Sequence, residues 1–162
     1  TIMQTLYNGK HSTIIEVNGK EMIKRVPASA MLAIDREGYV IMVEQDRGSF
    51  GKLIEVPAGK VEFGEDPLKT AERELMEETG YKANNIKHLI DYFPSVGYST
   101  EQINCYYSDD IKNTGIPHPD DGEEIRVVNI YWKDLLEMIQ NGEIKDSKTI
   151  MCVLAYEKMV GF

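Results

Sequence analysis

Cysteine is scarce in this sequence. Only Cys105 and Cys152 occur among 162 residues, each in apolar or aromatic surroundings and without the spacing of a redox motif or a metal site. A disulfide is improbable in a reducing compartment. We therefore expect two buried free thiols and no disulfide framework.

Long apolar runs are also absent. No stretch approaches the roughly 20 apolar residues that a membrane-spanning helix needs. The opening residues TIMQTLYNGKHS lack the basic and apolar regions of a signal peptide. We expect a cytoplasmic protein with no membrane partner.

Positive charge is in the minority, with 18 Lys and Arg against 27 Asp and Glu and a formal net charge of −9. A nucleic-acid partner needs a basic stripe on the protein, and none is visible. A phosphate substrate meets the same repulsion unless bound divalent ions supply positive potential. The composition therefore argues against nucleic acid as a partner and is compatible with metal-dependent chemistry on phosphates.

The length and the 42% share of apolar residues suit one core. Within residues 1–26, short extended segments alternate with Asn8-Gly9 and Asn18-Gly19, which is a strong hairpin signal. The segments are Gln4–Tyr7, Ser12–Val17 and Lys20–Val26. Three short strands are marginally stable by themselves, so this hairpin segment needs a surface to pack against.

The rest of the chain, residues 27–162, alternates predicted strands with helices. The expected strands are Ala28–Ile34, Tyr39–Glu44, Leu53–Val56, Ile86–Phe93, Glu101–Ser108 and Glu124–Trp132, with a turn at Pro57-Ala58-Gly59. Helices are expected over Pro67–Thr79, from Trp132-Lys133-Asp134 to Ile139, and from a cap at Asp146 or Ser147 to Met159. This order predicts an α/β protein with a mixed sheet between helical layers.

The helix predicted over residues 67–79 has local signals at both ends. Asp66 can cap it, Pro67 suits its first turn, and Gly80 stands where helices commonly end. An apolar stripe recurs at spacings of three and four, and should face the sheet. Its members are Leu68, Ala71 and Leu75.

The same helix brings acidic side chains together. Glu74 lies three residues before Glu77 and four before Glu78, so these like charges share one helix face and repel one another. They also lie toward the C-terminal end, where the helix dipole prefers cations. A divalent cation, Mg²⁺ or Mn²⁺, would compensate, and Arg73 can pair with Glu77. The alternative is a solvated acidic face with ordinary ion pairs.

The segment from Gly59 to Tyr81, GKVEFGEDPLKTAERELMEETGY, fits the pattern G-x5-E-x7-R-E-U-x-E-E-x-G-U at every specified position, where U is bulky and apolar. It resembles the Nudix box. The resemblance implies the Nudix α/β/α sandwich over residues 27–162, with a mixed sheet and a loop–helix–loop. It also implies metal-dependent attack of water on a nucleoside diphosphate linked to another moiety.

The resemblance assigns roles to individual box residues. Glu74 and Glu78 are the expected metal ligands, with the backbone carbonyl of Ala58 as a further one. Arg73 orients the acids, and Glu77 lies close to the reaction. Glu65 has two possible roles, either reaching the box carboxylates through Arg73 or favouring the helix N-terminus.

Segments outside the box resemble ADP-ribose pyrophosphatases. LIEVPAGK at 53–60 is similar to their ELPAGK segment, and VEQDR at 43–47 to their V-x-Q-x-R stretch. FPSVGYSTE at 93–101 is similar to their S-P-G-x-x-x-E loop, although Val96 replaces the proline before the glycine. The region after residue 122 also looks like the C-terminal part of that family.

This subfamily resemblance implies further site residues. An acidic loop over His118–Glu124 would deliver Glu123 or Glu124 as the group that activates water. The candidates for substrate binding are Arg25, Arg47, Glu55, Tyr98 and Glu101. An Arg or Tyr in a strand or loop can equally be plain surface. The family commonly dimerises by exchange of N-terminal strands, which would cover open edges and place Arg25 near the partner's pocket.

The expected function is hydrolysis of ADP-ribose or a related nucleoside diphosphate sugar to AMP and a sugar phosphate. One alternative is a nucleoside triphosphate pyrophosphatase such as an 8-oxo-dGTPase. Another is a non-catalytic ADP-ribose sensor, which would be expected to lose box acids that this chain keeps.

Overall fold

The computed structural model describes residues 2–161. Its strands are β1 (Met3–Asn8), β2 (Thr13–Val17), β3 (Lys20–Lys24), β4 (Ala28–Ala33), β5 (Tyr39–Asp46), β6 (Lys52–Glu55), β7 (Ala58–Lys60), β8 (Tyr81–Asn84), β9 (Lys87–Tyr92), β10 (Ile103–Ser108), β11 (Asp110–Asn113) and β12 (Ile125–Tyr131). The helices are α1 (Pro67–Thr79), α2 (Trp132–Gln140) and α3 (Ser147–Met159), with a short 3-10 helix η1 (Gly48–Phe50).

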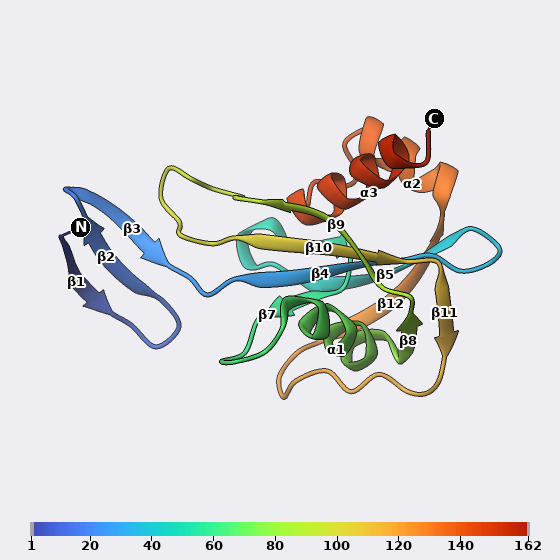
Figure 1. The fold of residues 1–162 in the computed structure, drawn as a ribbon, viewed down its shortest axis with the longest axis horizontal. Helices are drawn as coiled ribbons and strands as arrows, with labels where there is room; N and C mark the ends of the chain where they lie inside the picture. Colours follow the sequence, from blue (N-terminus) through green and yellow to red (C-terminus); the bar gives the residue numbers. More distant parts are fainter. Residues whose placement is uncertain (1, 162) are drawn as a thin grey trace.

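The strands form a mixed α/β architecture. A sheet in the order β7-β4-β10-β9 lies beside one in the order β12-β5-β6, and β11 pairs with β8. The β4–β10 pair is parallel, and the other pairs of these sheets are antiparallel. Helix α1 lies on one side of the central strands, and α2 and α3 lie on the other (Figure 1). The predicted sheet between helical layers is confirmed.

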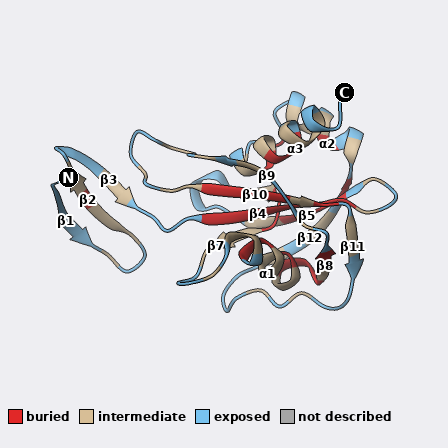
Figure 2. Ribbon diagram, viewed as in Figure 1, coloured by how far each residue is buried: buried red, intermediate tan, exposed pale blue. Residues whose placement is uncertain are grey.

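Strand β4 is buried on both faces, as Figure 2 shows. Its alternate residues divide between two hydrophobic clusters, which is the period expected of a strand. Leu32 packs with residues of α2 and α3 such as Leu135 and Val153. Met31 packs with Ala71 and Leu75 of α1. The predicted apolar stripe of α1 therefore does face the sheet.

Helix α1 begins and ends where its sequence predicts. The Asp66 side chain accepts a hydrogen bond from Leu68 N at 2.8 Å, and Pro67 occupies the first turn. Gly80 has φ 76°, and its N–H donates to Met76 O at 2.8 Å. These local signals set where α1 begins and ends, and so they also set the direction in which the box acids project from it.

The first three strands form a separate sheet, β1-β2-β3, which projects from the body of the molecule (Figure 1). It is attached through β3, where Ile23 N donates to Tyr98 O at 2.7 Å and Thr100 N donates to Ile23 O at 3.0 Å. Strand β1 is exposed along its whole length. Both predicted hairpins form, although the first loop extends to Ser12.

Some sequence predictions of local structure were wrong. The expected turn at residues 57–59 is instead partly strand, because β7 pairs with β4 through Ala58–Ala30 and its neighbours. Strands β8 and β11 were not predicted, since they are short and polar and form a two-stranded sheet with each other. Glu101 and Glu124 precede β10 and β12 instead of belonging to them.

Cys105 and Cys152 are buried free thiols, as predicted, and the structure places both in one hydrophobic cluster. Among residues 2–161 no helix combines the length and the hydropathy needed to cross a membrane.

Candidate active site

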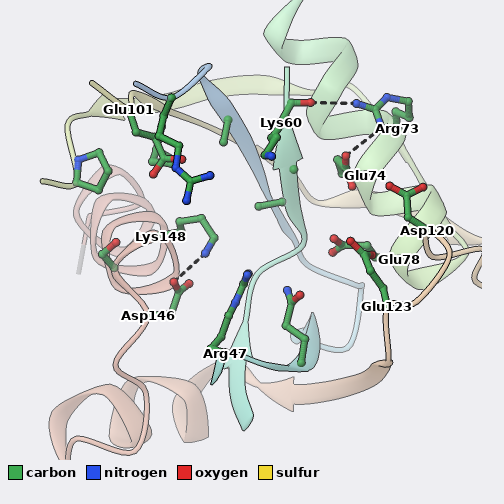
Figure 3. A pocket seen from close by; sticks show the side chains of 18 of the residues that line it. Arg47, Lys60, Arg73, Glu74, Glu78, Glu101, Asp120, Glu123, Asp146 and Lys148 are labelled. Carbon is green, nitrogen blue, oxygen red and sulfur yellow. Dashed lines mark hydrogen bonds and ion pairs between the residues drawn. The ribbon is translucent and has the colours of Figure 1, made fainter. Parts of the chain in front are cut away.

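A cavity of about 720 Å³ opens between the C-terminal half of α1, the ends of β5 and β7, the loop before β12 and the first turn of α3. Figure 3 shows its side chains. It gathers most of the predicted site residues from distant parts of the sequence, namely Arg25, Arg47, Ala58, Arg73, Glu74, Glu78, Glu101 and Glu123. Other charged residues that line it were not among the predicted site residues, including Lys60, Asp120, Asp146 and Lys148.

Four predicted residues do not line this cavity. Glu55 lies behind Arg47 and accepts a hydrogen bond from it, and Glu77 accepts one from Arg73 at the rim of the cavity. Tyr98 lines a neighbouring hollow together with Arg25 and Glu101. Glu124 lines a different hollow, formed by the loop before β12 and by residues of β5, β6 and β12.

Glu78 and Glu74 are held in an unfavourable electrostatic environment. Glu78 is 4% exposed, and its Oε2 has no hydrogen-bond partner among the described residues. Burial, and then the charge of Glu74, raise the pKa of Glu78 to about 9. Burial raises the pKa of Glu74 to about 7 against the opposing effect of Arg73. A group that adds positive charge here would relieve both carboxylates.

Arg73 organises the acids around itself. Its Nη1 donates to Glu74 Oε1 at 2.9 Å and to Glu77 Oε2 at 3.1 Å, while its Nη2 donates to the carbonyl of Lys60 at 3.2 Å. Its Nε donates to Glu65 Oε2 at 2.9 Å. Of the two roles considered for Glu65, the structure therefore places it against Arg73, whose hydrogen bond lowers the pKa of Glu65 to about 2.

Two features of β7 allow this strand to lie close to the carboxylates of Glu74 and Glu78. A Cβ atom on Gly59 would overlap the carboxylate of Glu74, so only glycine leaves that side chain in place. The backbone of Ala58 forms a hydrogen bond that partly offsets the raised pKa of Glu78. The short strand therefore forms one side of the acid cluster.

The residues fit a divalent cation. Within residues 2–161 no three His, Cys, Asp or Glu side chains converge as a complete ligand set. Two carboxylates, one with an unpaired buried oxygen, and the Ala58 carbonyl would nevertheless suit an ion that keeps water and substrate oxygens in its other positions.

The loop before β12 brings further acids to the cavity. Its start is attached to the end of α1, where Thr114 N donates to Gly80 O at 3.0 Å and His118 N donates to Glu77 O at 2.6 Å. Beyond this attachment Asp120 and Glu123 both face the box acids (Figure 3). Of the two glutamates considered from the sequence, only Glu123 lines the cavity. Asp120 could have been noticed from the acidic run that includes it.

Comparison with known proteins agrees with this geometry. The family model of the NUDIX domain matches residues 24–151. The chain belongs to the Nudix family. The resemblance drawn from the box is confirmed, and the chain is a Nudix pyrophosphatase. Nudix hydrolases generally use divalent metal ions.

Several proteins of known name resemble this Nudix chain. It is 36% identical over 85% of its length, and 76% of the relative's, to a protein of Bacillus methanolicus named methanol dehydrogenase activator. It is 33% identical over 91% of its length, and 78% of the relative's, to an ADP-ribose pyrophosphatase of Bacillus subtilis. It is 34% identical over 82% of its length, and 71% of the relative's, to a GDP-mannose pyrophosphatase of Yersinia pestis.

The Nudix fold is also found in a solved structure described as an ADP compounds hydrolase. The TM-score is 0.81 over 98% of this chain and 91% of that chain, at 16% identity. At that identity the match concerns the fold alone.

Proposed function

We propose that the protein is an Mg²⁺-dependent hydrolase that cleaves the diphosphate of ADP-ribose or a related nucleoside diphosphate sugar. The products are AMP and a sugar phosphate. The observation that carries the proposal is the pair of a buried Glu78 and a partly buried Glu74 on the box helix, both lining a cavity of about 720 Å³. The similarity to pyrophosphatases of ADP-ribose and GDP-mannose supports this class of substrate.

In this proposal the box residues bind metal. Glu74, Glu78 and the Ala58 carbonyl hold divalent ions, for which Mn²⁺ could substitute. Arg73 fixes the Glu74 and Glu77 carboxylates through hydrogen bonds of 2.9 and 3.1 Å. Bound ions would neutralise the diphosphate and lower the pKa of a water molecule beside it.

Glu123 is proposed to position that water and accept its proton. It lines the cavity beside Glu78 (Figure 3), and it sits in a loop whose start is attached to the end of α1 at Thr114 and His118. The water oxygen bonds to one phosphorus, the bridging P–O bond breaks, and the bridging oxygen leaves with the other phosphate. Asp120 is a second acid within the same loop that faces the box helix.

The remaining wall is proposed to bind the two organic moieties. Arg47 and Arg25 offer guanidinium groups, and Glu101 a carboxylate, on the cavity surface. Tyr98 lies in the adjoining hollow, where a base or sugar could extend beside Arg25. Glu55 is not on the surface, and its proposed role is to hold Arg47.

We also propose a homodimer in which the β1-β2-β3 sheet meets a second copy. The exposed β1 strand, with Met3, Leu6 and Tyr7 among its uncovered side chains, favours such a contact. A cytoplasmic location stays a prediction.

The deciding experiment measures AMP release from ADP-ribose with Mg²⁺, with Mn²⁺ and with chelator. ADP-glucose, GDP-mannose, NADH and 8-oxo-dGTP serve as competing substrates. Preferred, metal-dependent cleavage of ADP-ribose is the expected result. Preference for 8-oxo-dGTP would favour the triphosphate alternative, and ADP-ribose binding without turnover of any compound would favour the sensor.

A further inference from the structure

The cavity wall opposite the box acids contains a buried charged network. Glu55 at the end of β6 is 1% exposed, and its carboxylate is shared by two cations. Arg47 donates from Nε to Oε2 at 2.7 Å and from Nη2 to Oε1 at 2.8 Å. Lys148, which is 93 residues away from Glu55 in the sequence, donates from Nζ to Oε1 at 2.9 Å.

Lys148 also links this wall to the start of α3. Its Nζ donates to Asp146 Oδ1 at 2.8 Å, and Asp146 Oδ2 accepts from the Thr149 N–H at 3.1 Å and from its hydroxyl at 2.7 Å. Thr149 Oγ1 then accepts from Val56 N at 3.0 Å. The Lys148 side chain is only 14% exposed and lies between two carboxylates. It therefore has little freedom to turn toward a ligand in the cavity.

The network determines which edge of Arg47 faces the cavity. Glu55 engages Nε and Nη2, and within the described residues no hydrogen bond involves Nη1. Arg47 is 42% exposed and lines the cavity. Its remaining N–H groups therefore form an open edge, and a guanidinium edge matches phosphate oxygens in two-point contacts.

Removing Lys148 would upset this arrangement. With both cations present, the four side chains Arg47, Glu55, Asp146 and Lys148 are balanced in charge. Without Lys148, the buried Glu55 carboxylate would keep a single cationic partner on one side and gain freedom to rotate. A buried charge with too few donors is unfavourable, so Glu55 and the attached Arg47 would move.

We propose that Lys148 is a positioning residue: by holding Glu55 from the α3 side, it fixes Arg47 with its open edge toward the substrate diphosphate. This inference rests on the proposed function, because it takes a nucleoside diphosphate as the ligand. Lys148 acts through Glu55 and Arg47, and does not itself contact the substrate.

Steady-state kinetics with the preferred diphosphate substrate provide the first test. Lys148→Met should raise KM about tenfold and change kcat less than about threefold, because binding is impaired more than chemistry. Lys148→Arg should recover most of the loss, since its guanidinium can reach both carboxylates. Lys145→Met, the same substitution at an exposed lysine nearby, should have wild-type kinetics.

A double-mutant cycle distinguishes positioning from direct contact. In an Arg47→Ala background, Lys148→Met should change KM less than about twofold, because no guanidinium remains to be positioned. An equal, roughly tenfold effect in both backgrounds would mean that Lys148 meets the substrate directly, and would overturn the inference.

A readout without substrate completes the design. The paired Nε–H of Arg47 should give a protected NMR signal in the wild type, assigned by its loss in Arg47→Ala. Lys148→Met should lose it or exchange it at least about tenfold faster, whereas Lys148→Arg should keep it. Unchanged protection in Lys148→Met would overturn the inference.

Failure of the wild type to cleave any diphosphate would instead count against the proposed function. Thermal unfolding of each variant checks that it is folded.

Discussion

Glu78 is buried, and one of its carboxylate oxygens has no hydrogen-bond partner within residues 2–161, an arrangement that costs folding free energy. Neighbouring Glu74 adds like-charge repulsion, which is one cause of the raised pKa of Glu78. Such strain is expected where a protein keeps a site ready for a cation. At the scale of single residues, the site is therefore recognised by carboxylates whose burial and mutual repulsion the fold does not fully compensate.

We predict that Glu78→Gln lowers activity by at least about 100-fold, because a neutral amide binds a divalent ion poorly. Without metal its free energy of unfolding should stay level or rise by up to about 1 kcal/mol, since a neutral amide replaces a carboxyl group that is costly to ionise in this buried position. The rise in melting temperature that Mg²⁺ gives the wild type should disappear. Glu72→Gln, at a surface residue paired with Lys69, is the control. Wild-type metal dependence in Glu78→Gln would refute the ligand assignment.

A second prediction concerns pH and Glu65. The Arg73 hydrogen bond lowers the pKa of Glu65 to about 2, so the ionised form is favoured in the folded state. Its stabilisation should be complete above the usual carboxyl pKa of about 4.5 and decline as pH falls toward about 2. Glu65→Gln should be about 1–2 kcal/mol less stable than the wild type near pH 7, with the difference shrinking in acid.

Urea unfolding between pH 7 and pH 3 measures this difference. Glu62→Gln is the matched control, because the exposed Glu62 lies 3.9 Å from Arg73 Nη2 and should contribute less than about 0.5 kcal/mol. A difference for Glu65→Gln that does not depend on pH would contradict the pairing.

At the scale of elements, the C-terminus of α1 is linked to the acidic loop that precedes β12. Gly80 adopts φ 76°, and a Cβ there would overlap the carbonyl of Gly115. The carbonyls of Gly80 and Glu77 accept from Thr114 N and His118 N. The end of one helix thus sets where the acidic loop begins.

We therefore predict that Gly80→Ala destabilises the fold by roughly 2–4 kcal/mol, from backbone strain and overlap together. Gly142→Ala is a close control, because Gly142 follows α2 with φ 83° and has open space around it. It should lose only about 1 kcal/mol. Similar losses in urea unfolding of the two variants would show that the overlap does not matter.

Elements with local signals were predicted well. The bounds expected for α1 agree with the structure because Asp66, Pro67 and Gly80 act within a few residues of the ends. Strand β7 was missed because its existence depends on pairing with β4, which lies far away in the sequence. Strands β8 and β11 likewise need each other.

At the scale of the whole molecule, the projecting β1-β2-β3 sheet predicts a dimer. We expect light scattering to give twice the mass of one chain. Leu6→Glu should shift the protein toward monomer and lower activity, because charge would enter the contact. Leu154→Glu changes a leucine of similar exposure, 46% against 43% for Leu6, on α3 and should leave the dimer intact. Full activity from a monomer would contradict a role for the partner subunit in the site.

The sequence by itself determined the Nudix box, its helix and the face on which Glu74 and Glu78 lie, because helix caps and helical spacing act over a few residues. Only the tertiary structure decided that Glu123, and not Glu124, lines the cavity and that Asp120 joins it. It also decided that Lys148 supports Glu55 across 93 residues of sequence. Such contacts depend on how strands and helices pack, and no local pattern encodes that.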